Sequence, residues 1–576
     1  MIIKSKFNTK SLTDNKILLL YLSVLSFIIQ YLHFSSFGLY EDDYWSIAAG
    51  YTTTLHQLLS KVLDCFIYWP TGRPLNHALP ACLGYLGHQL GGINALYIIA
   101  SLWLGLNAWL IYTIVRTWLD KPAAFLAALV YISFPADTTR QLLVHVSHVQ
   151  GAMTFMLIGW MLWLKETRTR WIAYLIASLA LLSYETAFIA FVAAPLFGKR
   201  NSKISELKIW LEHILGCGTI LGIVGLIRIH LADPRTISVL GSPKEAVLKA
   251  ITSCILGPIT IIHAYIVALT TGWKSITLLS LCACFLILIL LYLIKRFENS
   301  SSATQPCFRK RIISASLITL ALSYSLTLVN YPPTQLAGRL TSTHVAAALP
   351  WSIIIGIIYY LSSRQSIYLK KILFFLYALA LFPLIGYSFS IQASYSEAWK
   401  LQKEFWQQIL NLTPDISDNT SIIVAGTPSL ASEPRFINSN AWADYYACQL
   451  LFDSDSRIKN SRSISFGHLG VVPELWDFTI SKGKIQSWKP KYWTDTSKPS
   501  QLLPPKYQLL SSVNLILIYS DHGKLSRVSA LQLNIPDNTG HTINYTLESY
   551  QLIPLVSHSI EPSSRLFKEL WSRTDK

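Results

Sequence analysis

The sequence predicts a mainly α-helical, polytopic membrane protein with about 11 spans, followed by a C-terminal mixed α/β domain outside the cytoplasm. Composition is the first observation behind this fold class: 52% of the 576 residues are hydrophobic and only 14% are charged. The mean hydropathy of +0.39 agrees with it. Finally, apolar runs of about 20 residues, the length that crosses a hydrocarbon core, recur along the first two thirds of the chain. Together these features exclude an ordinary soluble protein.

Eleven apolar segments are expected to cross the membrane. Their approximate bounds are residues 17–37, 92–115, 122–135, 149–164, 171–184, 186–198, 209–231, 275–294, 312–330, 346–362 and 370–390. The first span follows a basic start, as a secretory signal peptide does. However, it is long, contains Gln30 and His33 and has no small-residue cleavage site. We therefore expect it to be retained as a transmembrane helix.

Lysine and arginine residues predict the orientation, because short cytoplasmic loops are enriched in them. The basic residues lie at the N-terminus and in alternate turns: Lys4, Lys6, Lys10, Lys16, Arg116, Lys121, Lys165, Arg168, Arg170, Lys199, Arg200, Lys203, Lys295, Arg296, Arg309, Lys310, Arg311, Arg364, Lys370 and Lys371. These basic residues all lie on the same side of the membrane only if residues 247–272 do not cross it. We expect that segment to be a re-entrant or interfacial helix, and a twelfth span is the alternative.

This orientation places the N-terminus in the cytoplasm and the C-terminal domain outside it. A bacterial inner membrane with a periplasmic C-terminal domain is the expected setting, and the endoplasmic reticulum is the alternative. Much of the net charge of +17 then lies in turns that face anionic lipid. No nucleic-acid-binding motif accompanies this charge, so nucleic acid is not an expected partner.

The composition divides the chain near residue 390. Residues 1–390 carry the apolar runs, whereas residues 391–576 are rich in Pro, Ser, Asp and Lys. In the second part, residues 396–410 have a helical pattern, and residues 421–425 and 513–519 have the apolar character of strands. A small mixed α/β domain is expected there.

The longest outer loop of the first part covers residues 38–91. It opens with three consecutive carboxylates, Glu41-Asp42-Asp43, followed by Tyr44-Trp45. An amphipathic run over residues 54–66 comes next, and the loop continues through Arg73 to His77. Because amphipathic segments rich in Trp and Tyr settle at the membrane interface, we expect the loop to lie flat on the membrane. The alternative for the carboxylates is a solvated loop start or a helix N-cap.

Other outer loops contribute polar residues. Asp137, Arg140, Glu185 and Arg339 lie there, and ionisable groups at membrane level are usually functional or paired. Arg73 and Arg339 each follow a glycine, and a guanidinium group beside flexible backbone is a good phosphate ligand. As alternatives, each arginine could anchor a lipid headgroup, and Glu185 could cap a tight turn.

His145 and His148 are spaced by about one helical turn, which places both imidazoles on one helix face, as a metal pair requires. No third ligand lies near them in the sequence. They are therefore weak candidates for a divalent metal site, and the sequence indicates no other cofactor.

Several short motifs, in this order and on this side of the membrane, carry a family resemblance. They are Asp42-Asp43-Tyr44-Trp45, Gly72-Arg73-Pro74, Leu182-Ser183-Tyr184-Glu185-Thr186 and Gly338-Arg339. The arrangement resembles the GT-C superfamily of membrane glycosyltransferases. That superfamily includes protein O-mannosyltransferases, aminoarabinose transferases and bacterial O-antigen glucosyltransferases. The resemblance covers roughly residues 15–390.

The resemblance implies transfer of a sugar, with inversion, from a polyprenyl-phosphate carrier to an acceptor on the outer face. It places Asp42 at the position of the general base and Asp43 at that of its partner, although Glu41 could shift this assignment by one residue. The expected substrate-binding residues are Glu41, Arg73, His77, Asp137, Arg140, Glu185 and Arg339. Arg73 and Arg339 are the first candidates for binding the donor phosphate, and Arg140 and Arg228 are the second.

The expected partners are the polyprenyl-phosphate-linked sugar donor, membrane lipid and an acceptor that could be a glycan, a lipid or a protein. Aromatic residues of the C-terminal domain would suit stacking on sugar rings, although core packing explains them equally well: Trp442, Tyr445, Tyr446, Trp476, Trp488 and Trp493. A lipid-linked oligosaccharide ligase or polymerase is an alternative function. A transporter is disfavoured because the acidic residues gather in outer loops and not within spans.

Overall fold

The computed structural model describes most of the chain. It covers residues 9–573 except 166–168, 199–202, 232, 276–280, 286, 288–305, 329–330, 363–366, 415, 417–419, 427–440, 453–464, 469–475, 482–483, 491–514, 537–541, 549–561 and 563. Most of the expected span over residues 275–294 lies outside the described residues.

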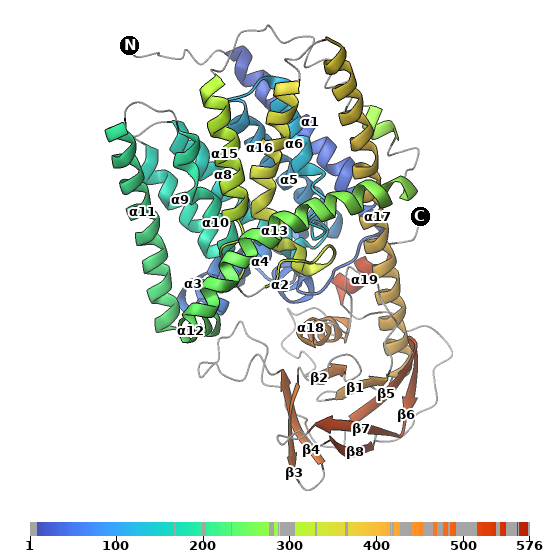
Figure 1. Cartoon of the computed structure of the whole chain (residues 1–576). Helices are drawn as coiled ribbons and strands as arrows, with labels where there is room; N and C mark the ends of the chain where they lie inside the picture. The colour runs from blue at the N-terminus through green and yellow to red at the C-terminus, as the bar shows by residue number, and fades with distance from the viewer. Residues whose placement is uncertain are drawn as a thin grey trace.

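The first two thirds of the chain form a helical bundle (Figure 1). Its helices, in chain order, are α1 (Thr9–Tyr31), α2 (Asp43–Tyr51), α3 (Leu55–Tyr68), α4 (Pro74–Leu90), α5 (Ile93–Val115), α6 (Lys121–Ile132), α7 (Leu143–His145), α8 (Gly151–Lys165), α9 (Arg170–Ser183), α10 (Glu185–Val192), α11 (Lys203–His230), α12 (Pro234–Gly241), α13 (Pro243–Thr271), α15 (Pro306–Leu322), α16 (Val345–Ser362) and α17 (Ile367–Leu412). The mainly α-helical class is therefore confirmed.

Five helices are long and apolar enough to cross a membrane. They cover Ile93–Val115, Glu206–His230, Pro243–Ser275, Arg339–Ser362 and Phe375–Leu412. Shorter apolar helices occupy three further expected spans: Lys16–Tyr31, Lys121–Ile132 and Arg170–Ser183. These helices are compatible with an integral membrane protein, and the count of eleven spans stays a prediction.

The segment expected to lie at the interface forms one continuous helix, α13. By length and composition alone this helix could span a membrane. In Figure 1, however, α13 runs obliquely across the bundle, whereas α11, α15 and α17 run along it. It packs against α15 and α17. An interfacial position fits this direction, and the choice between interface and span stays a prediction.

The C-terminal part contains a small sheet, as expected. Its strands are ordered β2 (Ser465–His468), β1 (Ser421–Gly426), β5 (Leu515–Asp521) and β6 (Lys524–Val528). The β1 strand pairs in parallel with β2 and β5, and β6 is antiparallel to β5. Two hairpins and two helices complete the described part: β3 (Trp476–Ser481) with β4 (Lys484–Pro490), β7 (Ala530–Pro536) with β8 (Thr542–Glu548), α18 (Ala441–Phe452) and α19 (Arg565–Trp571).

The expected strands near residues 421 and 513 are thus present. The expected helix over residues 396–410 is the end of α17, which is continuous for 46 residues. The compositional division at residue 390 therefore falls inside a helix. In Figure 1 this single helix links the bundle to the sheet.

Helix α19 returns from the C-terminal part to the bundle. Glu569 accepts a hydrogen bond from the backbone N–H of Ile93 at 2.7 Å and one from the Tyr51 hydroxyl. The Phe567 ring stacks on Tyr44, with ring centroids 6.1 Å apart. Arg573, just beyond α19, donates to the Phe34 carbonyl at 2.7 Å. Residues 565–573 therefore hold α2 and the start of α5.

Candidate active site

Helix α2 presents the acidic cluster at its N-terminus. Glu41 has a left-handed backbone (φ +44°), Asp42 is the N-cap residue, and Asp43 is the first residue of the helix. The helix packs so closely on α4 that a Cβ added at Gly50 or at Gly84 would overlap the backbone of the other helix. These glycines therefore fix the position of the cluster against α4.

Asp43 is completely buried, and both of its carboxylate oxygens accept hydrogen bonds from the backbone. Its Oδ1 accepts a hydrogen bond from the Val144 N–H at 2.7 Å, and its Oδ2 accepts one from the Tyr40 N–H at 3.1 Å. Burial raises the pKa of Asp43 to about 8, although these N–H groups act in the opposite direction. With both oxygens used internally, Asp43 ties α2 to the segment before α8.

Asp42 has a different environment from its neighbour. Its carboxylate lies 2.5 Å from Nη2 of Arg339, and Nη1 of the same arginine lies 3.4 Å from the carboxylate of Glu41. The Asp42 side chain is 13% exposed and that of Arg339 is 36% exposed, whereas Glu41 is buried. The structure therefore brings together three expected site residues, and of the three carboxylates Asp42 is the most accessible.

The loop around Asp137 supports Arg339. Gly338 has a φ of +83°, which favours glycine, and it turns the chain into the 3-10 helix η7 (Arg339–His344). The Gly338 N–H donates to the Thr138 hydroxyl at 3.0 Å, and the Thr138 N–H donates to the Thr341 hydroxyl at 3.1 Å. The loop that follows α6 thus holds the backbone on both sides of Arg339.

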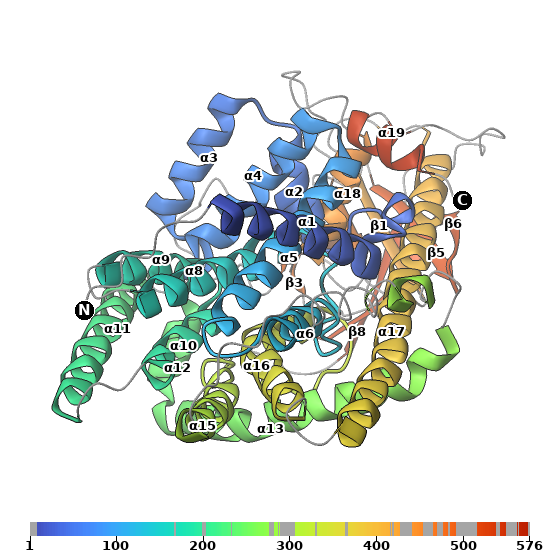
Figure 2. The same cartoon turned by 90° about the horizontal axis from the view of Figure 1, so that it is seen from above.

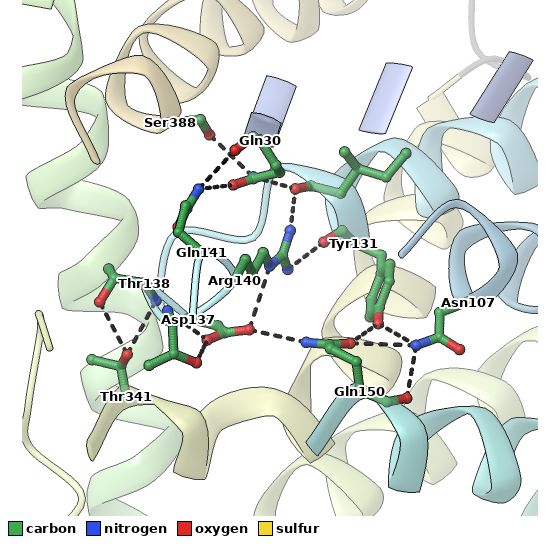
Figure 3. A network of polar contacts seen from close by, with 12 residues as sticks. Gln30, Asn107, Tyr131, Asp137, Thr138, Arg140, Gln141, Gln150, Thr341 and Ser388 are labelled. Carbon is green, nitrogen blue, oxygen red and sulfur yellow. Dashed lines mark hydrogen bonds and ion pairs between the residues drawn. The ribbon is translucent and has the colours of Figure 1, made fainter. Parts of the chain in front are cut away.

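Asp137 and Arg140 belong to a buried network, shown in Figure 3. Their ion pair is 3.4 Å long, and both side chains are almost completely inaccessible. Arg140 also donates to the carbonyls of Tyr131 (at 2.6 Å) and Ile132. Asp137 accepts from Nε2 of Gln150 at 3.2 Å. The structure places these two expected substrate-binding residues in the bundle core, where their contacts support the loop that holds Arg339.

Arg73 lies in a second charged group. It follows a tight turn in which Trp69, Thr71 and Gly72 all have positive φ angles, of +45°, +53° and +66°. Such backbone is costly for the two non-glycine residues. The turn delivers the Arg73 guanidinium group to Glu185, with Nη2–Oε1 and Nε–Oε2 distances both 2.6 Å. Glu185 begins α10, directly after the chain breaks from α9 at Tyr184.

Two further arginines surround Glu185. Nη1 of Arg228 lies 3.7 Å from Oε1 of Glu185, and its Nε donates to the Gly72 carbonyl at 2.9 Å. Repulsion from Arg73, followed by burial, lowers the pKa of Arg235 to about 10. Burial alone would raise the pKa of Glu185, but Arg73 and Arg228 outweigh it and lower the value to about 2. Glu185 is thus an ionised carboxylate paired with Arg73 and Arg228, and the charge of Arg235 is near enough to act on it as well.

Arg235 is a residue that the sequence reasoning missed. It lies in α12, just after the expected span over residues 209–231. Its signal in the sequence is the polar Asp233-Pro234-Arg235 immediately after that apolar run. Asp233 caps α12 by accepting hydrogen bonds from the N–H and hydroxyl of Thr236, at 3.2 and 2.8 Å. The cap fixes the turn that carries Arg235.

His77 and Tyr184 interact electrostatically with residues of both charged groups. The His77 ring packs edge-on against Trp45, with centroids 4.8 Å apart, and its Nε2 is 3.1 Å from the Thr71 hydroxyl. Burial lowers the pKa of His77 to about 4, although the Asp42 charge acts in the opposite direction, so the ring is neutral at pH 7. The Arg73 guanidinium group lies 5.3 Å from the centre of the Tyr184 ring.

His145 directly precedes a π-helical turn, Val146–Gln150, and His148 lies within it; such turns are often found at functional sites. Their ring centroids are 5.2 Å apart. In the described part of the chain, neither Nδ1 atom has a hydrogen-bond partner, although both are buried. No group of three or more His, Cys, Asp or Glu residues that could hold a metal ion occurs among the described residues. Among the residues that the structure describes, the two histidines are therefore a pair without a third ligand.

The fold and the site together define a helical, apolar protein with carboxylates and arginines gathered around the segment between α1 and α5. Comparisons with protein-family models and with curated protein sequences find no match.

Proposed function

We propose that this protein is an integral membrane glycosyltransferase that moves a sugar from a polyprenyl-phosphate carrier to an extracytoplasmic acceptor. The observation that carries the proposal is the position of Asp42. Its carboxylate is partly accessible and forms an ion pair with Arg339. Asp43 beside it instead accepts hydrogen bonds from backbone N–H groups on both oxygens. An accessible carboxylate next to fixed cations suits a general base that acts beside a phosphate leaving group.

In the proposed reaction, an acceptor hydroxyl attacks the anomeric carbon of the donor sugar. Asp42 takes the hydroxyl proton as the new C–O bond forms. The bond from the anomeric carbon to the phosphate oxygen breaks, and its electron pair leaves on the lipid phosphate. The attack from the opposite face inverts the configuration at that carbon.

The leaving phosphate gains negative charge and needs fixed cations. Arg73, Arg228 and Arg235 supply three guanidinium groups around Glu185, so the group has positive charge beyond what this carboxylate neutralises. Arg339 is partly exposed and is paired with both Glu41 and Asp42. Contact of Arg339 with the donor phosphate would loosen its pairing with Asp42 and leave that carboxylate to the acceptor.

The test compares Asp42→Asn with Asp120→Asn in purified protein supplied with polyprenyl-phosphate carrying a radiolabelled sugar and with an extract of cell-envelope glycans and lipids. Asparagine keeps the shape of Asp42 but cannot take a proton, so we expect transfer to fall about 100-fold or more. Asp120 is the matched control because it caps α6 through the Ala123 N–H at 3.0 Å. Asparagine caps helices equally well, so its activity should be unchanged.

Full activity of Asp42→Asn would contradict the assignment of the base. Loss of activity in both variants would point to general damage and also contradict it. The size of the product separates the related alternatives, since a ligase or polymerase would transfer a preformed glycan and not a single sugar.

A further inference from the structure

Trp45 lies beside the proposed base. Asp42 is the N-cap residue of α2, and the Trp45 N–H donates to the Asp42 carbonyl at 3.2 Å. Residues three apart in a helix lie on the same face, with their Cβ atoms about 5–6 Å apart. Trp45 is partly exposed, as Asp42 is, while Asp43 and Tyr44 between them are buried. The helix therefore presents one carboxylate and one indole ring on the same accessible face.

Two more rings extend this surface. His77 of α4 meets Trp45 edge-on at 4.8 Å, and Tyr446 of α18 stacks on Trp45 with centroids 6.4 Å apart and an angle of 28° between the rings. All three residues are partly exposed. The rings come from three separate segments, one of which belongs to the C-terminal part.

The packing of α18 fixes the third ring. Ala447, Cys448 and Leu451 of this helix are buried, while Tyr446 is directed at α2. Helix α18 packs against α2 and also contacts α19, which holds α2 through Phe567 and Tyr44. Tertiary packing therefore holds the surface of Trp45, His77 and Tyr446 in place.

The chemistry of this surface selects a ligand class. Sugar rings have a face of C–H groups that packs on an aromatic ring and a rim of hydroxyls that need hydrogen-bond partners. Trp45 and Tyr446 supply the aromatic faces, and His77 and the Thr71 hydroxyl, 3.1 Å apart, supply neutral donors and acceptors. A lipid tail would leave the remaining hydrogen-bonding capacity of the Thr71 hydroxyl unused, at a cost in free energy.

We infer that the acceptor is a carbohydrate and that Trp45, His77 and Tyr446 form its binding site beside Asp42. This inference depends on the proposed function for the reaction, but the binding it describes can be measured without turnover. The acceptor ring stacked on Trp45 would bring one of its hydroxyls to the Asp42 carboxylate, one helical turn away.

The experiment is saturation-transfer NMR with the full chain in a detergent that has no sugar headgroup. The probes are the methyl glycosides of glucose, galactose, mannose, rhamnose and N-acetylglucosamine. At least one glycoside should receive saturation on its ring C–H protons. The signal should fall about fivefold or more in Trp45→Ala and in Tyr446→Ala, and Trp45→Phe should retain most of it because a ring remains.

Trp171→Ala is the matched control, since Trp171 is an exposed tryptophan of α9. It should leave the signal unchanged. Asp42→Asn should also keep glycoside binding, even though it is expected to lose transfer, so the two proposals fail separately. The inference is overturned if no glycoside binds the unaltered protein, or if Trp45→Ala binds as well as Trp171→Ala does.

Discussion

Asp42 and Asp43 are adjacent carboxylates with different tasks in the structure. Consecutive residues at the start of a helix point in different directions. Asp43 consequently reaches the backbone of Val144 and Tyr40, whereas Asp42 reaches Arg339. Asp43 therefore supports the fold, whereas Asp42 is accessible to a substrate.

Asp43→Asn should destabilise the protein by about 1–3 kcal/mol at pH 5, because the new amide group faces one of two backbone donors. The effect should depend on pH. The pKa of Asp43 in the folded protein, about 8, lies above its ordinary value of 3.8. The carboxyl group therefore contributes fully below about pH 4, and its contribution is lost as the pH rises toward 8.

The measurement is the thermal unfolding midpoint of the unaltered protein and of Asp43→Asn in detergent, from pH 5 to pH 8.5. The deficit of Asp43→Asn should shrink as the pH rises, since asparagine does not titrate. Asp42→Asn serves as the control and should unfold close to the unaltered protein. An equal deficit at all pH values would contradict the raised pKa.

Helix α3 is an amphipathic helix at the edge of the bundle. Its N-terminus is closed by a reciprocal capping box between Thr54 and Gln57, which starts the helix just before its apolar stripe. Leu58 and Cys65 face inward, and Cys65 packs with Leu75 and Ala78 of α4. Figure 2 shows α3 at the edge of the bundle, beside α4.

The outer face of α3 carries large exposed hydrophobic side chains at helical spacing. They are Leu55, Leu59, Leu63, Phe66 and Ile67. A stripe of this kind is what the interface of a bilayer stabilises. The amphipathic helix predicted from the sequence is therefore present, and its interfacial location stays a prediction.

A photoreactive amino acid placed at Leu63 should crosslink to lipid. Leu63 is 62% exposed on the apolar face, whereas Asp64, the next residue, points about 100° around the helix. In lipid nanodiscs that contain a fluorescent phospholipid, we expect about threefold or more lipid adduct at position 63 relative to position 64. Equal labelling would show that α3 does not lie in the interface.

At the scale of the whole molecule, α13 decides the topology. If it lies at the interface, both of its ends are on one side of the membrane, which is the outer side in the expected orientation. If it spans, its two ends are on opposite sides. Its oblique direction in Figure 1 favours the first arrangement.

Single cysteines at Ser242 and Lys274 distinguish these arrangements. In intact cells treated with a membrane-impermeant maleimide, we expect labelling at both positions above that of the parent chain. A cysteine at Lys121, in an expected cytoplasmic turn, is the unlabelled control. Labelling at Ser242 alone would make α13 a true span and would require a new orientation for the helices that follow.

The sequence by itself determined what depends on local pattern. Hydropathy predicted the mainly helical class, the amphipathic pattern of residues 54–66 predicted α3, and apolar runs predicted the strands β1 and β5. These features follow from neighbouring residues, whose side-chain period sets which face is buried. The acidic cluster was also visible, since its three carboxylates are consecutive.

Only the tertiary structure decided how these residues are used. Glu41 and Arg339 are 298 positions apart, and their contact depends on the packing of the whole bundle. The same packing buried Asp137 with Arg140 and brought Arg235 toward Glu185. The physical reason is that burial and charge pairing depend on neighbours in space, which local periodicity does not encode.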